Sequence, residues 1–293
     1  MKPALILLLI LLAAVPYLAA QAEPTKYFLP ENILRFAESL YQEGDYLRAA
    51  GEFQRYLYSF DALPDKADAI IYKIGLCYKK GNDFEKSAAT FRKLLDFYPQ
   101  SPLAPDSYCE IGYSYFLMKS YDRSMAFLST PMSFNPSQDL NLKVLQLRGL
   151  NYLYKKQWNT AAVYFNSLEP PAKKNSLTQN LLNFADEGRR LPRKSQFLAG
   201  FLSAIIPGAG KIYSRRTADG LASLVTVGLT AWQAYEGFHK DGVHSTKGGI
   251  YGTLSAFFYV GNIYGSVVSV NIYNEHLENA LLEKIGIAIH VAF

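Results

Sequence analysis

A 37-residue register runs through the middle of this chain and limits what it can fold into. Glycine, two aromatic positions, a bulky apolar position and a small position each recur at that interval. The recurring sets are Gly75, Gly112 and Gly149; Tyr78, Tyr115 and Tyr152; Phe84, Tyr121 and Trp158; Phe91, Leu128 and Phe165; and Ser87, Ser124 and Ala161. Fixed self-similarity of this length indicates stacked helix-turn-helix units, and it favours partner binding over catalysis.

Each repeating unit is predicted to hold two amphipathic helices. In the second unit, residues 70–78 predict the first helix, and Gly81-Asn82-Asp83 ends it because Gly and Asn tolerate the left-handed backbone. Residues 84–97 have apolar side chains at helical spacing and predict the second helix, which Pro99 stops. A glycine inside the first helix is costly unless another helix approaches closely there.

The order of these positions resembles the tetratricopeptide repeat. The first unit has the same order at Gly44-Asp45-Tyr46, Ala49 and Phe53. The resemblance implies an all-α solenoid within residues 23–187, made of four units over about 31–169 and a capping helix at 176–187. The long period and the linker at 98–106 are similar to the periplasmic subfamily, which includes the repeat lipoprotein of the outer-membrane barrel assembly machine and the Tol-Pal coordinator.

The same resemblance implies a binding groove on the inner face of the first helices. The groove positions of the family correspond to Tyr72, Lys79, Lys80, Tyr113, Phe116 and Tyr154. Aromatic and cationic side chains there would hold an extended peptide or a helix of a partner protein. The alternative is that these aromatics pack between repeats or against the C-terminal region.

The first 22 residues have the pattern of a secretory signal. Lys2 precedes a charge-free apolar stretch at 4–15, and Ala20-Gln21-Ala22 is a small-x-small cleavage site. We therefore expect an exported protein of the cell envelope with the repeats on the periplasmic side. An uncleaved N-terminal anchor is the alternative.

Basic charge is concentrated at one junction. Residues 23–186 hold 19 basic and 18 acidic groups, whereas residues 187–216 hold seven basic groups and one acidic group. Next to an apolar segment, such a cluster predicts contact with anionic lipid headgroups, and nothing in the sequence predicts nucleic-acid binding. The candidate headgroup ligands are Arg189, Arg190, Arg193, Lys194, Arg215 and Arg216.

The two cysteines, Cys77 and Cys109, fall in neighbouring repeats at different repeat positions. An exported protein could oxidise them to a disulfide. Their unequal repeat positions favour two buried free thiols.

The C-terminal region predicts a glycine-rich transmembrane helical hairpin at 217–274, after a basic hinge and interfacial half-helix at 188–216. Apolar runs at 221–238 and 250–273 are long enough to cross a hydrocarbon core of about 30 Å. Gly261 and Gly265 stand four residues apart, a spacing that lets membrane helices pack closely. A soluble hairpin buried against the repeats is the alternative.

A second motif precedes this hairpin. Pro207, Gly208, Gly210 and Tyr213, followed by Gly220, resemble the Pro-Gly-x-Gly-Gln-x-Tyr start of small bacterial membrane-hairpin domains of unknown function, with Lys211 in place of the usual Gln. The resemblance implies a half-helix that turns at Pro-Gly, with Tyr213, Trp232 and Tyr251 near headgroup depth. A phosphate-binding loop is excluded because residue 205 and residue 212 are both Ile.

The tail at 275–293 ends in alternating apolar residues, Ile285, Ile287, Ile289, Val291 and Phe293. This alternation resembles the last strand of an outer-membrane barrel and predicts an edge strand or a chaperone-read signal.

No catalytic, metal-binding or cofactor-binding motif is found. The four histidines lack the spacing of metal ligands, and the sequence has no nucleophile elbow and no dinucleotide fingerprint. The leading hypothesis is a membrane-anchored scaffold that binds protein during envelope or outer-membrane assembly.

Two other functions remain open. One is a transport or insertion accessory in which the hairpin is the active part, with Asn262 and Asn271 facing a bundle interior. The other is a structural subunit of a larger envelope complex.

Overall fold

The computed structural model describes residues 29–59, 66–132 and 134–289, and these residues form helices, turns and connecting segments without a β-strand. The predicted signal and its cleavage site lie outside the described residues. The chain divides into two units, one up to Lys155 and one from Lys156. This boundary falls inside the predicted fourth repeat, so the two helices of that repeat belong to different units.

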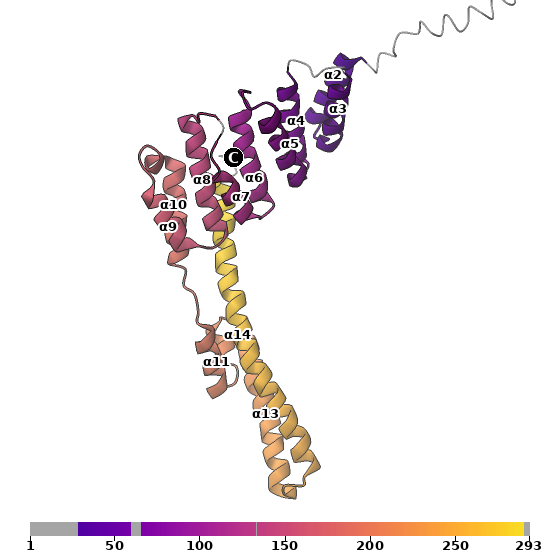
Figure 1. Cartoon of the computed structure of the whole chain (residues 1–293). Helices are drawn as coiled ribbons and strands as arrows, with labels where there is room; N and C mark the ends of the chain where they lie inside the picture. Colours follow the sequence, from indigo (N-terminus) through magenta and orange to yellow (C-terminus); the bar gives the residue numbers. More distant parts are fainter. Residues whose placement is uncertain (1–28, 60–65, 133, 290–293) are drawn as a thin grey trace, which may run out of the picture. The chain divides into compact units, whose positions relative to one another are not determined.

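The first unit contains successive antiparallel helices that pack side by side (Figure 1). Its helices are α2 (Pro30–Gln42), α3 (Tyr46–Tyr58), α4 (Ala67–Lys80), α5 (Phe84–Phe97), α6 (Ala104–Leu117), α7 (Tyr121–Leu128) and α8 (Gln138–Tyr154). Three helix pairs, α2 with α3, α4 with α5 and α6 with α7, correspond to the first three predicted repeats. The predicted all-α repeat solenoid is confirmed.

One left-handed residue ends the first helix of each repeat. Gly44, Asn82 and Lys119 have φ angles of 85°, 61° and 58°, and they occupy the same repeat position. Lys156 follows in the same register with a φ of 59°. The predicted helix break at Gly81-Asn82-Asp83 is confirmed, and Asn82 is the residue that adopts the left-handed backbone.

The repeated glycines are sites of close helix contact. A Cβ placed on Gly75 would lie 2.7 Å from the Phe91 ring, and one on Gly112 would lie 2.5 Å from a Leu128 methyl carbon. Phe91 and Leu128 belong to the bulky column of the same register. The glycine column and the bulky column therefore pack against each other within each repeat.

The second unit begins with α9 (Trp158–Ser167) and α10 (Ser176–Arg189), with a short 3-10 helix η2 (Ala172–Lys174) between them. The Asn175 side chain accepts hydrogen bonds from the N–H groups of Leu177 and Thr178, and so caps α10. The predicted helix at 176–187 is confirmed. A Cβ on Gly188 would lie 2.3 Å from the Trp158 ring, so α9 and α10 also approach closely at a glycine.

The rest of the second unit contains α11 (Gln196–Ile205), α12 (Ala209–Tyr213), α13 (Thr217–Asp241) and α14 (Thr246–Ile289). Helices α13 and α14 lie side by side as a hairpin, and α11 packs on α14 (Figure 1). The predicted turn at Pro207-Gly208 separates α11 from α12. Helix α14 continues through residue 274 without a break.

Two predictions about the C-terminal region differ from the structure. One described helix, α14, is long and apolar enough to cross a membrane, whereas two spans were predicted. The predicted strand in the tail is wrong for Ile285–Ile289, which form the end of α14, and residues 290–293 lie outside the described part. Ile285 and Ile289 are buried and Ile287 is 71% exposed, which is the spacing of a helix face.

Candidate functional site

The first candidate site is the surface formed by the first helices of the repeats, α4 and α6. Lys79 on α4 forms an ion pair with Glu110 on α6 at 2.6 Å, and its ammonium lies 5.4 Å from the centre of the Tyr113 ring. Tyr72, about two turns earlier on α4, packs edge-on against Phe91. Tyr72, Lys79 and Tyr113 thus lie on neighbouring helices and remain partly exposed.

These tyrosines stay neutral at physiological pH. Burial raises the pKa of Tyr72, and the nearby Glu110 and Asp106 carboxylates raise it further. Burial also raises the pKa of Tyr113 and of Tyr154. Each phenol would therefore meet a partner as an apolar ring with a neutral hydroxyl.

The remaining predicted groove residues have other surroundings. Phe116 is only 6% exposed and packs edge-on against Tyr154, so it belongs to the core rather than to a binding surface. Tyr154 also contacts Tyr121. Lys80 points to the previous repeat, where its ammonium lies over the rings of Tyr41 and Tyr46. For Phe116 the alternative of packing between repeats holds.

A buried polar ladder connects successive repeats and was not predicted. Ser87 and Ser124 donate hydrogen bonds to the carbonyls of Gly75 and Gly112. Ser87 also bonds Ser114 at 3.1 Å, and Ser124 accepts a bond from the Asn151 amide at 3.0 Å. Ser114 and Asn151 are themselves 37 residues apart, so the register contained the signal for this second column.

The second candidate site is the base of the hairpin, where the Pro-Gly motif folds. Gly208 has a φ of 89°, and a Cβ there would lie 1.9 Å from the Gly220 carbonyl oxygen. A Cβ on Gly210 would lie 2.0 Å from the Ala199 carbonyl oxygen. Three motif glycines, Gly208, Gly210 and Gly220, are therefore required by backbone contacts between α11, α12 and α13.

Asn262 of α14 holds this turn in place. Its side-chain oxygen accepts the Gly208 N–H at 2.9 Å, and its amide donates to the Ser203 carbonyl at 3.3 Å. It is 3% exposed. Asn271 is exposed and bonds Gln196. The two asparagines do not line a common interior, and so the hypothesis of a transport or insertion accessory loses the support it drew from them.

The basic cluster separates into neutralised and unneutralised members. Arg189 pairs with Asp186, Arg193 with Glu278, and Arg216 with Asp219. Lys194 instead lies over the rings of Tyr213 and Tyr273, and Arg215 lies over Tyr273. Within the described ranges, Arg190, Lys194 and Arg215 form no ion pair, so these three remain the better candidates for headgroup contact.

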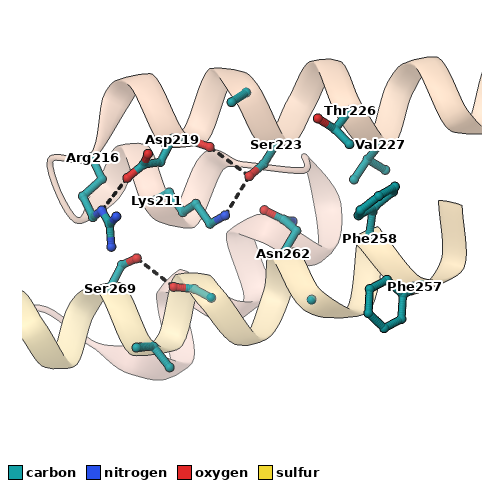
Figure 2. Close-up of a pocket in the computed structure, with 14 residues that line it drawn as sticks. Lys211, Arg216, Asp219, Ser223, Thr226, Val227, Phe257, Phe258, Asn262 and Ser269 are labelled. Atoms are coloured by element: carbon teal, nitrogen blue, oxygen red, sulfur yellow. Dashed lines mark hydrogen bonds and ion pairs between the residues drawn. The ribbon is translucent and has the colours of Figure 1, made fainter. Parts of the chain in front are cut away.

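A pocket of about 520 Å³ lies between α12, α13 and α14 in this hairpin base. Lys211 and Asn262 lie between the two long helices, Arg216 and Asp219 are at one end, and Phe257 and Phe258 are at the other (Figure 2). The Lys211 ammonium donates a hydrogen bond to Ser223 at 2.7 Å. The pocket therefore has a cationic end and an apolar end.

The two glycines predicted to mediate helix packing lie in this pocket. A Cβ on Gly261 would meet no atom within 4 Å, and one on Gly265 would meet the Lys211 side chain at 3.3 Å. Within the described chain, no other helix packs closely against Gly261, and close packing of membrane helices at this glycine stays a prediction. Both glycines line the pocket.

No group of three or more His, Cys, Asp or Glu side chains in the described segments could hold a metal ion. Both cysteines are free thiols, and Cys77 is buried as predicted, whereas Cys109 is partly exposed.

Comparison with known proteins supports the repeat assignment. Residues 68–101 match the family model of the tetratricopeptide repeat, and this segment covers α4 and α5 of the second repeat. No curated protein and no solved structure matches the chain. Stacked repeats of this kind are typical of protein–protein interaction scaffolds without catalytic activity.

Proposed function

We propose that this protein is a membrane-anchored scaffold of the cell envelope that binds a partner protein through its repeats. The repeat match at 68–101 supports the binding role. The signal pattern of residues 1–22 and the likeness to periplasmic repeats support a location in the envelope, with the repeats on the periplasmic side. A role in envelope or outer-membrane protein assembly fits both.

The exposure of α14 carries the membrane part of this proposal. Only 22% of its most apolar 18-residue window is buried, whereas the core helix of a soluble protein is mostly buried. Its charge-free run at 248–274 has 27 residues and spans roughly 40 Å, more than the hydrocarbon core. Such an apolar and exposed helix needs a nonpolar environment.

The neighbouring helices present similar surfaces. On α11, Phe197, Phe201 and Ile205 are exposed at a spacing of four residues and so share one face. On α13, the large exposed apolar residues are Leu221, Leu224, Val225, Leu229, Trp232, Tyr235 and Phe238. Together these faces form a large exposed apolar surface, which marks a membrane or partner interface.

Helix α13 is less suited to cross a membrane alone. Its charge-free run at 220–235 has 16 residues and spans roughly 24 Å. At the hairpin tip, Glu236 pairs with Lys240 at 2.6 Å and with Lys247 at 2.9 Å, which reduces the cost of charges near lipid. We propose that α13 enters the membrane as a partner of α14.

The partner-binding surface in this proposal is the exposed side of α4 and α6 with Tyr72, Lys79 and Tyr113. A protein or peptide would pack on the two tyrosines, and an acidic group of that partner would compete with Glu110 for Lys79.

Crosslinking and affinity capture from envelopes test this surface. We expect Tyr113→Ala to reduce capture of the main crosslinked partner at least tenfold. Phe97→Ala is the matched control because Phe97 is 73% exposed on the second helix α5. Equal capture by the wild type and Tyr113→Ala, with both proteins equally stable, would reject this surface as the binding site.

A further inference from the structure

We infer that the pocket at the hairpin base binds one acidic phospholipid, with the phosphate beside Lys211 and an acyl chain along Gly261. The inference rests on the proposed insertion of the hairpin into a membrane. It adds a specific lipid site to what the anchor alone would require.

The charge of Lys211 indicates an anionic ligand. No carboxylate in the described part of the chain pairs with it, and its one hydrogen bond goes to Ser223. The Ser223 hydroxyl donates to the Asp219 carbonyl at 2.8 Å, so its oxygen is oriented to accept from the ammonium. An ammonium has three N–H donors, and beside an apolar helix an unpaired charge is costly. A phosphate would both neutralise it and accept the remaining donors.

A second cation borders the same end of the pocket. Arg216 is paired with Asp219 through its Nε and is about half exposed. Its two terminal nitrogens extend away from that bond at the pocket rim, and they suit a phosphate oxygen (Figure 2).

The other end of the pocket suits a hydrocarbon chain. Val227, Phe257 and Phe258 line it (Figure 2). Gly261 and Gly265 are among the residues of α14 that line the pocket. The open space beside Gly261 gives a path along α14 for an unbranched chain. The pocket volume of about 520 Å³ lies within the range of small-molecule sites.

This combination separates a lipid from other occupants. A free phosphate would leave the apolar end unfilled, and a membrane helix of another protein would leave the Lys211 ammonium without an anion. An acidic phospholipid supplies both parts.

Native mass spectrometry of the full-length protein in neutral detergent tests the inference, with phosphatidylglycerol and phosphatidylcholine as probes. We expect one phosphatidylglycerol to be retained, with at least tenfold weaker binding of phosphatidylcholine. Lys211→Gln should weaken phosphatidylglycerol at least tenfold, while Lys211→Arg should stay within about threefold of the wild type because the charge is kept.

Two further variants distinguish binding of the acyl chain in the pocket from non-specific attraction of the lipid to basic residues. Gly261→Leu keeps every charge but fills the open space, and it should weaken phosphatidylglycerol at least tenfold. Lys174→Gln removes an exposed cation outside the pocket and outside the basic cluster, and it should leave binding unchanged. If circular dichroism shows that Lys211→Gln does not fold, the lipid site is judged from the other two variants: Lys211→Arg should keep phosphatidylglycerol binding and Gly261→Leu should weaken it.

Several outcomes would overturn the lipid site. These are equal retention of the two lipids, unchanged binding in Gly261→Leu, displacement of phosphatidylglycerol by millimolar inorganic phosphate, or a lipid-free dimer that Gly261→Leu disrupts. The membrane anchor is tested apart from this site, because a protein that stays in membranes but fails these tests loses only the lipid site. A protein that does not enter membranes loses the proposed function itself.

Discussion

At the scale of single residues, the repeats are specified by glycines that face bulky side chains. Gly75 faces Phe91 and Gly112 faces Leu128, and a serine one turn before each bulky residue bonds the glycine carbonyl. The intrinsic cost of glycine in a helix is offset by this close approach.

Adding a methyl group at such a glycine should destabilise the repeat unit. Gly75→Ala would place its Cβ 2.7 Å from the Phe91 ring, and we expect a loss of about 1–3 kcal/mol in the free energy of unfolding. Urea denaturation measures it. Gly51→Ala is the matched control, since a Cβ there meets no atom within 4 Å and should stabilise α3 by about 0.5–1 kcal/mol. Equal effects of the two substitutions would contradict the packing account.

The two cysteines should react slowly in the folded protein. Burial raises the pKa of the Cys77 thiol and that of the Cys109 thiol to about 12. At pH 8 only about one thiol in ten thousand would be ionised, and the thiolate is the reactive form. We expect thiol reagents to label both residues slowly until the repeats unfold, with the partly exposed Cys109 labelled before the buried Cys77, as measured by mass spectrometry after denaturant titration. Rapid labelling of Cys77 in native buffer would contradict its burial in the repeat core.

The sequence register predicted much at this scale and missed one column. The glycine, aromatic and bulky positions were visible because their side chains keep the same character in each repeat. The column of Ser114 and Asn151 was not visible, because its members are of different residue types and are related only by their hydrogen bonds. In the second repeat, the same position is occupied by Cys77. Phe116 was predicted to lie in the groove because it occupies a groove position of the family, but such a position does not indicate how deeply the side chain is buried.

At the scale of elements, the hairpin base depends on one asparagine. Asn262 satisfies the Gly208 N–H and the Ser203 carbonyl, two backbone groups left unpaired where α11 ends. A backbone polar group without a partner is costly in an apolar environment.

Replacing Asn262 should therefore loosen the Pro-Gly turn. We expect Asn262→Leu to cost about 1–3 kcal/mol for each unsatisfied group and to expose the 205–216 segment to protease in detergent. Asn271→Leu is the control, because Asn271 is exposed and should give little change. Identical protease patterns for Asn262→Leu and the wild type would contradict this role.

Sequence patterns were less reliable at the C-terminus. The alternation of Ile285, Ile287 and Ile289 has the period of a strand, yet α14 includes all three residues. Two of them, Ile285 and Ile289, are also four residues apart, and this helical spacing is the one that the structure uses. A short apolar run cannot distinguish the two periods when a long helix precedes it.

At the scale of the whole molecule, the chain joins a nearly neutral repeat unit to an apolar hairpin with basic residues at its base. The repeat unit has a buried core and a partly exposed aromatic surface. The hairpin shows the reverse pattern, since large apolar side chains along α13 and α14 are exposed and its buried side chains include Asn262, Ser266 and Ser269. This contrast is expected when one part is folded for water and the other for lipid.

Alkaline carbonate extraction of membranes tests the central claim most directly. We predict that most of the full-length protein stays in the membrane pellet. Val260→Arg should increase release, because Val260 is exposed near the middle of the charge-free run of α14 and a charge there costs about 2.5–3.5 kcal/mol in a bilayer. Recovery of the wild-type protein in the carbonate supernatant would contradict the membrane-anchored scaffold.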